Sequence, residues 1–85
     1  MSQTRTAPSG FLSEDVRIGA TIREMRTMRG MNQDDLSRAA MISRAYVANI
    51  ESGRKRPSMK VIARIASALH VPQISIIARV DADAA

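Results

Sequence analysis

The sequence contains no cysteine and no tryptophan, and Phe11 and Tyr46 are its only aromatic residues. Without cysteine, a disulfide framework and a thiolate metal site are excluded. No apolar run approaches the length of a membrane span, and the N-terminus lacks a secretory apolar region, so we expect a cytoplasmic protein with no membrane partner. With so few aromatic residues, the core must consist of Ile, Val, Leu, Met and Ala, which favours helices over a β-sandwich.

The charge balance of the chain is basic. Its 85 residues are enough for one small domain, and the formal net charge is +5. All but two of the 13 basic residues are Arg, which pairs with phosphate and guanine better than Lys does. Such a balance favours an anionic partner, with nucleic acid ahead of a membrane surface. Taken alone, it is equally compatible with arginines that only solvate exposed helix faces.

The chain divides into three sections by composition. Residues 1–12 mix Ser, Thr, Pro and Gly without periodicity, and we interpret them as a flexible N-terminal arm. Residues 13–80 carry the apolar periodicity of a folded domain, and residues 81–85 form a short tail that we expect to fray.

Polar cap residues followed by helically spaced apolar residues predict four helices, so we expect an all-α fold. The predicted starts are Ser13, Asn32, Ser43 and the Pro57-Ser58 pair. Gly30, Gly53 and His70 mark the predicted ends of three of these helices. The residues expected to face the core are Ile18, Ile22, Met25, Leu36, Ala39, Ala40, Val47, Ile50, Met59, Ile62, Ile65, Ala66 and Leu69.

The segment "VPQISIIARV" is ambiguous. It could form a short fifth helix opened by Pro72 at its first position, which we favour, or a strand that pairs across a dimer. In the helical geometry one isoleucine would be left facing water. In the strand geometry an unpaired edge would seek a partner. We therefore predict a dimer interface in this segment, made of Ile74, Ile76 and Ile77 with Val80 in support.

The stretch from Asn32 to Gly53 has the spacing of a helix-turn-helix, because about three residues separate its two short helices. Such a tight turn buries the inner faces and leaves the outer face of the second helix clear of the body. That outer face carries Arg44, Ala45, Ala48 and Asn49. Small alanines would let the helix enter a major groove about 12 Å wide, where Arg can bind guanine and Asn can bind adenine.

An ordered series of short motifs extends this pattern over residues 18–77. It comprises Ile22-Arg23-Glu24-Met25-Arg26, Met31-Asn32-Gln33-Asp34-Asp35-Leu36, Ile42-Ser43-Arg44-Ala45-Tyr46-Val47, Ile50-Glu51-Ser52-Gly53, Arg56-Pro57-Ser58 and Ile65-Ala66-Ser67-Ala68-Leu69. The series resembles the Cro/repressor-type, or XRE-type, helix-turn-helix family. The resemblance implies a compact lambda-repressor-like domain of four to five helices.

The resemblance also implies roles for matching positions. Arg44, Ala45 and Asn49 occupy base-contacting positions. Positions that contact phosphates are Asn32, Gln33, Ser43, Tyr46, Arg54, Lys55 and Arg56. Arg26 and Glu51 match an internal ion pair that ties the first helix to the end of the recognition helix, at about residues 43–51.

Two positions depart from the family pattern. Met41 stands at a turn position commonly held by Gly. If its backbone is left-handed, this costs on the order of 1 kcal/mol, and otherwise the turn differs and re-aims the recognition helix. Ile74 stands where the family usually has a polar residue, which places an extra apolar side chain near the C-terminus.

The chain lacks the nucleophile, base and orienting group of an enzyme, and its lone His70 has no metal-binding companion, so we expect neither catalysis nor a cofactor. The predicted function is a transcription regulator of bacterial or phage origin, associated with the nucleoid when bound. It would bind double-stranded DNA as a homodimer on an inverted repeat. Open alternatives are a repressor, a restriction–modification controller protein, and an antitoxin with a small protein partner.

Overall fold

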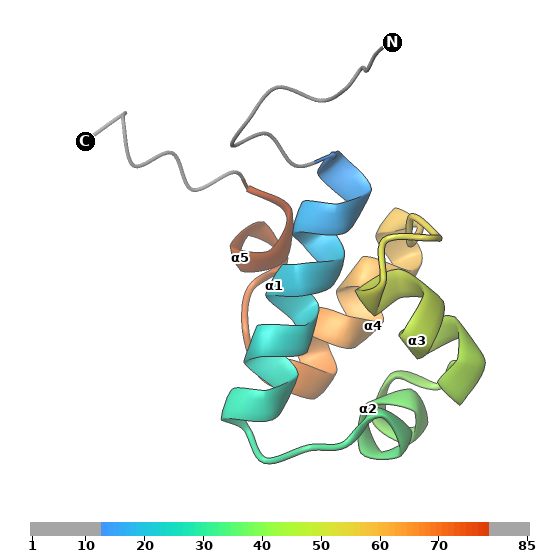
Figure 1. Ribbon diagram of the computed structural model, residues 1–85. Coiled ribbons are helices and arrows are strands. Elements are labelled where there is room, and N and C mark those ends of the chain that lie inside the picture. The colour runs from blue at the N-terminus through green and yellow to red at the C-terminus, as the bar shows by residue number, and fades with distance from the viewer. Residues whose placement is uncertain (1–12, 79–85) are drawn as a thin grey trace, which may run out of the picture.

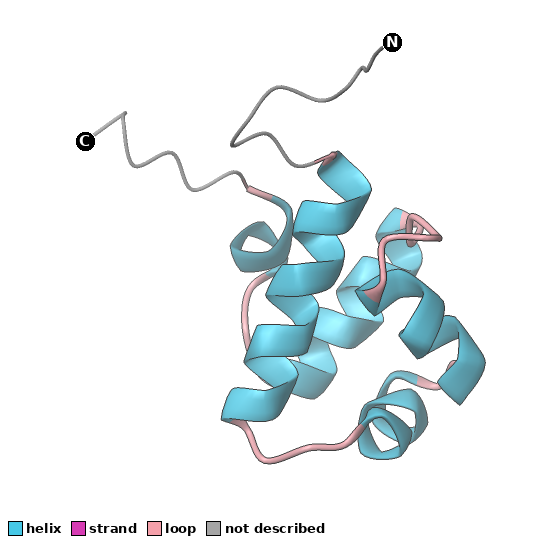
Figure 2. Ribbon diagram, viewed as in Figure 1, coloured by secondary structure: helices cyan, strands magenta, loops and turns pink. Residues whose placement is uncertain are grey.

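The computed structural model describes residues 13–78, and this range contains five helices and no strand (Figure 1, Figure 2). The helices are α1 (Glu14–Met28), α2 (Gln33–Ala40), α3 (Arg44–Glu51), α4 (Met59–Leu69) and α5 (Gln73–Ile77). None of them is long and apolar enough to cross a bilayer. The predicted all-α fold is therefore confirmed. The predicted arm, residues 1–12, and the predicted tail, residues 81–85, lie outside the described residues.

Four of the helices begin at the polar caps that the sequence predicts. The side chains of Ser13, Asn32, Ser43 and Ser58 each accept a hydrogen bond from the backbone N–H three residues later. Asn32 and Asp35 form a reciprocal capping box, with bonds of 2.7 and 2.9 Å. Each cap contributes about 1 kcal/mol and fixes where its helix starts.

Helix α1 lies at the centre of the molecule, with α5 on one side and α3 on the other (Figure 1). It packs against α3, α4 and α5, while α2 packs against α3 and α4. The buried apolar residues form one cluster: Ile18, Ile22, Leu36, Ala40, Val47, Ile50, Ile62, Ile65, Ala66, Leu69 and Ile76. Helix α3 is therefore held at the edge of a core to which all five helices contribute.

Two residues of the predicted core are exposed. Ala39 faces solvent, and Ser37 is buried in its place, with its hydroxyl donating to the Asp34 carbonyl at 2.8 Å. This hydrogen bond satisfies the only polar group of the Ser37 side chain, so burial is tolerated. Met59 is 60% exposed because it is the first residue of α4, and the buried stripe begins one turn later at Ile62.

Helices α1 and α3 approach each other closely at Gly19. A Cβ atom at this position would lie 2.1 Å from the Ile50 carbonyl oxygen and 2.8 Å from that of Glu51. These distances are shorter than any tolerated contact, so only glycine fits here. The backbone of the last turn of α3 thus rests directly on α1.

Within the ambiguous segment, Gln73–Ile77 form the helix α5, and this decides between the two geometries for the described residues. Pro72 is its N-cap and precedes the first helical position. Ile76 is fully buried in the core of the monomer, so its assignment to a dimer interface is wrong. Ile74 is 63% exposed, and Ile77 is half-buried against the core. Val80 lies outside the described residues.

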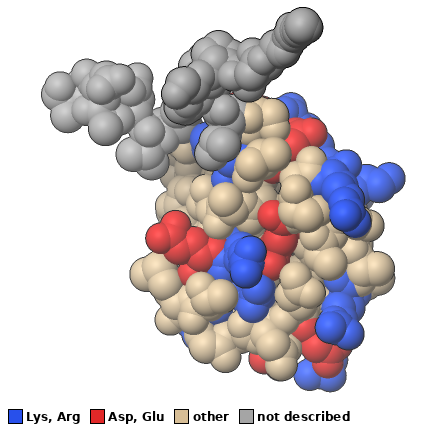
Figure 3. All heavy atoms as spheres, in the orientation of Figure 1, with Lys and Arg blue, Asp and Glu red and all other residues tan. Residues whose placement is uncertain are grey.

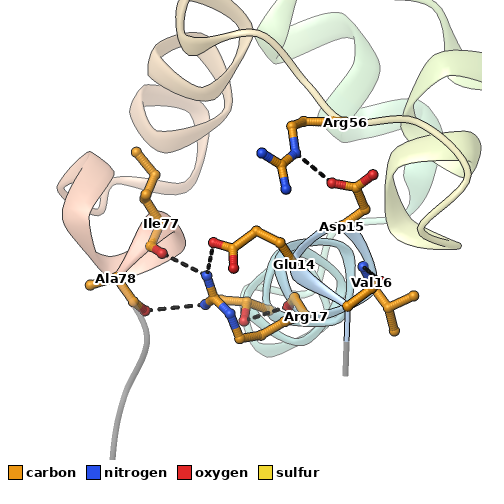
Figure 4. A network of polar contacts seen from close by, with 9 residues as sticks. Glu14, Asp15, Val16, Arg17, Arg56, Ile77 and Ala78 are labelled. Atoms are coloured by element: carbon orange, nitrogen blue, oxygen red, sulfur yellow. Dashed lines mark hydrogen bonds and ion pairs between the residues drawn. The ribbon is translucent and has the colours of Figure 1, made fainter. Parts of the chain in front are cut away.

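The first two turns of α1 hold two other parts of the chain (Figure 4). Arg17 donates to the carbonyls of Ile77 at 2.7 Å and Ala78 at 3.2 Å, where α5 ends. Asp15 pairs with Arg56 from the loop after α3. The hydrogen bond to Asp15 raises the pKa of the Arg56 guanidinium above its ordinary value. Sequence patterns did not indicate either link, because each joins residues far apart in the chain.

Candidate nucleic-acid interface

The turn between α2 and α3 keeps a left-handed residue although glycine is absent. Met41 has φ 59° and ψ 46°, and the residue is 72% exposed, so its side chain is not pressed against the core. The Ile42 N–H donates to the Ser37 carbonyl at 3.0 Å and closes the turn. The first of the two alternatives for Met41 is therefore confirmed. The helix-turn-helix geometry is kept at a backbone cost on the order of 1 kcal/mol.

Helix α3 has one buried face and one accessible face. Val47 and Ile50 are each 1% exposed, whereas Arg44 and Ala45 are exposed and Asn49 is half-buried. The orientation predicted from the spacing is confirmed. The base contacts assigned to Arg44, Ala45 and Asn49 stay predictions.

The predicted ion pair between Arg26 and Glu51 is present. Arg26 Nε lies 2.7 Å from Glu51 Oε2, and Arg26 Nη2 lies 3.0 Å from Oε1, so the contact is bidentate. The two side chains are only 10% and 3% exposed. The hydrogen bond to Glu51 raises the pKa of Arg26 above its ordinary value, and desolvation opposes the shift. Arg26 also donates to the Met31 carbonyl at 2.7 Å, so one side chain joins α1, the loop before α2 and the end of α3.

Gln33 joins the same network, which the sequence did not reveal. Its Nε2 donates to Glu51 Oε1 at 3.1 Å. Gln33 also lines three adjoining hollows in the surface. The α2–α3 hollow is lined by Arg26, Asn32, Gln33, Asp34 and Arg44, and the α3 groove by Gln33, Arg44, Ala45 and Ala48. The α1–α3 hollow is lined by Arg23, Arg26, Gln33, Ala48, Glu51 and Ser52.

The structure therefore brings Asn32, Gln33, Arg44 and Ala45 together around these hollows. It also adds Arg23, which the sequence analysis left unassigned. A signal for Arg23 was available, since it lies one turn before Arg26 and so on the same face of α1.

The other predicted phosphate contacts lie outside the three hollows. The hydroxyl of Ser43 is the cap of α3, and half-buried Tyr46 packs against the core. Arg54 and Lys55 are exposed, and their backbone N–H groups both donate to the Asn49 carbonyl, at 2.9 and 3.2 Å. Arg56 is held by Asp15. Only Arg54 and Lys55 of the basic loop thus have no acidic partner among residues 13–78.

On the face of the molecule shown in Figure 3, the charged side chains do not form one uniform basic patch. On the face shown in Figure 3, basic groups are distributed over the surface and several lie beside acidic ones. Ion pairs between Arg38 and Asp34 at 2.8 Å and between Arg56 and Asp15 belong to this pattern. These pairs neutralise Arg38 and Arg56 locally, so unpaired basic side chains are the better candidates for contact with an anion.

Comparison with known proteins identifies the family. A helix-turn-helix family model matches residues 22–72. The chain is 38% identical over 50 residues to the ImmF control region 10 kDa protein of Bacillus phage phi105, covering 59% of this chain and 56% of that protein. It is 34% identical over 55 residues to the transcriptional regulator ClgR of Mycobacterium tuberculosis, covering 65% and 49%. The chain thus spans about half the length of these curated relatives.

Solved structures agree with this similarity. The restriction-modification controller protein C.AhdI from Aeromonas hydrophila superposes with a TM-score of 0.74 at 29% identity, covering 76% of this chain and 98% of that one. The clp gene regulator ClgR from Corynebacterium glutamicum also gives 0.74, at 26% identity, covering 78% and 86%. Since the family model spans more than half of the sequence, the protein belongs to the Cro/repressor-type helix-turn-helix family, whose members are DNA-binding transcription regulators and not enzymes.

Proposed function

We propose that this protein is a sequence-specific, double-stranded-DNA-binding transcription regulator that inserts α3 into the major groove. The observation that carries the proposal is that α3 is packed firmly on its inner face and exposed on its outer face. Its inner face is fixed by the Gly19 contact and by the buried Arg26–Glu51 pair, while Arg44 and Ala45 stand exposed. A helix held rigidly from behind with short and hydrogen-bonding side chains in front suits direct contact with base edges.

Each outer residue of α3 has a distinct chemical role in this proposal. Arg44 can donate two hydrogen bonds to guanine, Asn49 can bind the edge of adenine, and the Ala45 methyl can contact thymine. The phosphate contacts come from Asn32, Gln33, Ser43, Tyr46, Arg54, Lys55 and Arg56. Of these, Arg56 must exchange its bond to Asp15 for the DNA, so we expect it to contribute less than Arg54 or Lys55.

The experiment that tests this function is selection of bound sequences from random duplex DNA, followed by binding measurements with the selected operator. Arg44→Ala and Asn49→Ala should each weaken operator binding by about 1–3 kcal/mol and leave non-specific binding nearly unchanged. Arg38→Ala is the matched control, because Arg38 is exposed on α2 and already paired with Asp34. Operator binding of both α3 variants at the wild-type level would exclude α3 as the base-contacting helix.

We also propose that the protein acts as a homodimer on an inverted-repeat operator. One helix contacts only a few base pairs, and two-fold pairing presents a second helix about 34 Å away. Ile74 supports this proposal, since a large apolar side chain that is 63% exposed on α5 suits coverage by another subunit.

The dimer is tested by Ile74→Asp. This change should raise the dimer dissociation constant and abolish tight operator binding while the helical signal is kept. Met59→Asp is the matched control, because Met59 is 60% exposed and belongs to α4. Equal masses for wild type and Ile74→Asp in sedimentation at micromolar concentration would place the interface elsewhere.

Repression is the regulatory outcome that we propose. The chain is 37% identical over 60 residues to the immunity repressor protein of Bacillus phage phi105, covering 71% of this chain and 41% of that protein. The similarity to C.AhdI supports a controller protein as a second candidate. A reporter gene with the selected operator placed over its promoter tests repression, because a repressor bound there must lower expression; unchanged or raised expression would exclude this outcome.

A further inference from the structure

We propose that Arg23 of α1 and Gln33 of α2 form a binding site for a DNA backbone phosphate in the α1–α3 hollow, so that α1 takes part in DNA binding. The inference rests on the proposed function and extends it to a helix outside the helix-turn-helix. The hollow lies beside the last turn of α3, since Glu51 and Ser52 belong to its lining.

The Gln33 amide has a defined orientation. A carboxylate oxygen only accepts hydrogen bonds, so the 3.1 Å contact with Glu51 requires the nitrogen of Gln33 to face it. Glu51 is itself fixed by the bidentate bond to Arg26. One N–H of Gln33 is therefore used internally, and the other remains for a ligand in the adjoining hollow.

The arginines in residues 13–78 differ in whether a carboxylate holds them. Arg17, Arg26, Arg38 and Arg56 each have a carboxylate partner. Arg23 has no such partner in that range and is exposed, yet it lines a hollow that also contains Gln33. Arg44 lines the hollows that Gln33 shares with α3. Gln33 thus shares hollows with two arginines that have no carboxylate partner in residues 13–78, Arg23 and Arg44, and only Arg44 belongs to α3.

The charge and shape of the α1–α3 hollow suit an anion. Arg23 and Arg26 carry positive charges, and Glu51 carries one negative charge that Arg26 already compensates. The remaining positive charge is that of Arg23. Ala48 contributes only a methyl group to the lining, which leaves room for a tetrahedral anion. When a protein helix lies in the major groove, the anion that the DNA presents beside the end of that helix is a backbone phosphate.

The experiment compares Arg23→Ala with wild type on two probes, the selected operator and a random-sequence duplex, over a range of salt concentrations. Loss of one phosphate contact should flatten the salt slope by about 1 and lower affinity roughly five- to tenfold at 0.1 M salt, equally on both probes. Arg23→Lys keeps the charge and should keep the slope. Lys60→Ala, which removes an exposed charge from α4, is the matched control and should change the slope far less.

The outcomes separate this inference from the proposed function. If Arg23→Ala and Lys60→Ala have the same effect, only long-range electrostatics is involved and the site is disproved. A lower midpoint of thermal unfolding in Arg23→Ala would show a structural role and would also overturn the inference. If wild type shows no sequence preference, the proposed function fails, whereas a flattened slope on the random duplex would still establish the phosphate site.

Discussion

Helix α1 carries two arginines that each hold the end of another helix, and they do so in different ways. Arg26 binds the carboxylate of Glu51, the last residue of α3. Arg17 binds the main-chain carbonyls of Ile77 and Ala78 at the end of α5. The first link holds the proposed recognition helix, and the second holds the proposed dimerisation helix. One helix therefore positions both.

The two links differ in what is left when the arginine is removed. Without Arg26, Glu51 would keep a negative charge on a side chain that is 3% exposed. Without Arg17, two carbonyls would lose a donor, and neither carries a formal charge. The comparison indicates that a buried partner charge, more than the number of hydrogen bonds, decides how strongly a link is required. The link made by Arg17 is also weakened by a desolvation cost, because the Arg17 Nε is buried without a hydrogen-bond partner within residues 13–78.

The largest effect is expected from Arg26→Ala. It should lower the free energy of unfolding by about 3 kcal/mol, the lower end of the range for buried pairs, because Arg26 lines hollows that open to solvent. Urea denaturation measures the change. A double-mutant cycle with Glu51→Ala should show strong coupling between the two positions. Strict additivity would contradict the role assigned to this pair.

An intermediate effect is expected from Arg17→Ala. Hydrogen bonds from a charged donor contribute about 1.5–3 kcal/mol, and the released carbonyls can bind water, so we expect a loss of about 1–2 kcal/mol. Hydrogen exchange should localise the loss to α5 and leave α3 protected. The Ala78 N–H, which donates to the Ile74 carbonyl at 2.9 Å, is a suitable probe. Faster exchange spread evenly over the domain would show that Arg17 does not act through α5.

The smallest effect is expected from Glu14→Ala. Glu14 pairs with Arg17 at 2.7 Å, but its side chain is 44% exposed, and exposed pairs contribute between about 0 and 1 kcal/mol. The carbonyl bonds of Arg17 should therefore persist. The midpoint of thermal unfolding should fall slightly, with little dependence on salt above 0.2 M, roughly where screening removes surface attraction. A loss as large as that of Arg17→Ala would show that the carboxylate, and not the carbonyls, is the essential partner.

Much of the fold follows from local chemistry, and that part could be predicted from the sequence. The caps Ser13, Asn32 and Ser43 act within three residues of themselves, so their patterns are visible in the chain. The stripe from Ile62 to Leu69 likewise reports its buried face directly. The Arg26–Glu51 pair was expected only because the family resemblance implied it.

The remaining features depend on how helices meet, and no periodicity contains that information. Whether Ile74 or Ile76 enters the core depends on the angle at which α5 packs against α1 and α4. The burial of Ser37 in place of Ala39 depends on which side of α2 packs against α3 and α4. The link from Gln33 to Glu51 requires the final distance between α2 and α3. Arg23 becomes a candidate for phosphate binding only because it lines the hollow that this helix packing creates.

The contact at Gly19 has a consequence for how such a protein can change its target. Because the backbone of the last turn of α3 rests on Gly19 of α1, and the Arg26–Glu51 pair and the buried Val47 and Ile50 hold its inner face, the position of α3 does not depend on its outer side chains. Substitutions at Arg44, Ala45, Ala48 and Asn49 should therefore alter the preferred base sequence and leave the presentation of the helix intact. We therefore expect the preferred base sequence to change without a change in the fold that presents α3. A library restricted to these four positions should yield folded variants with new operators.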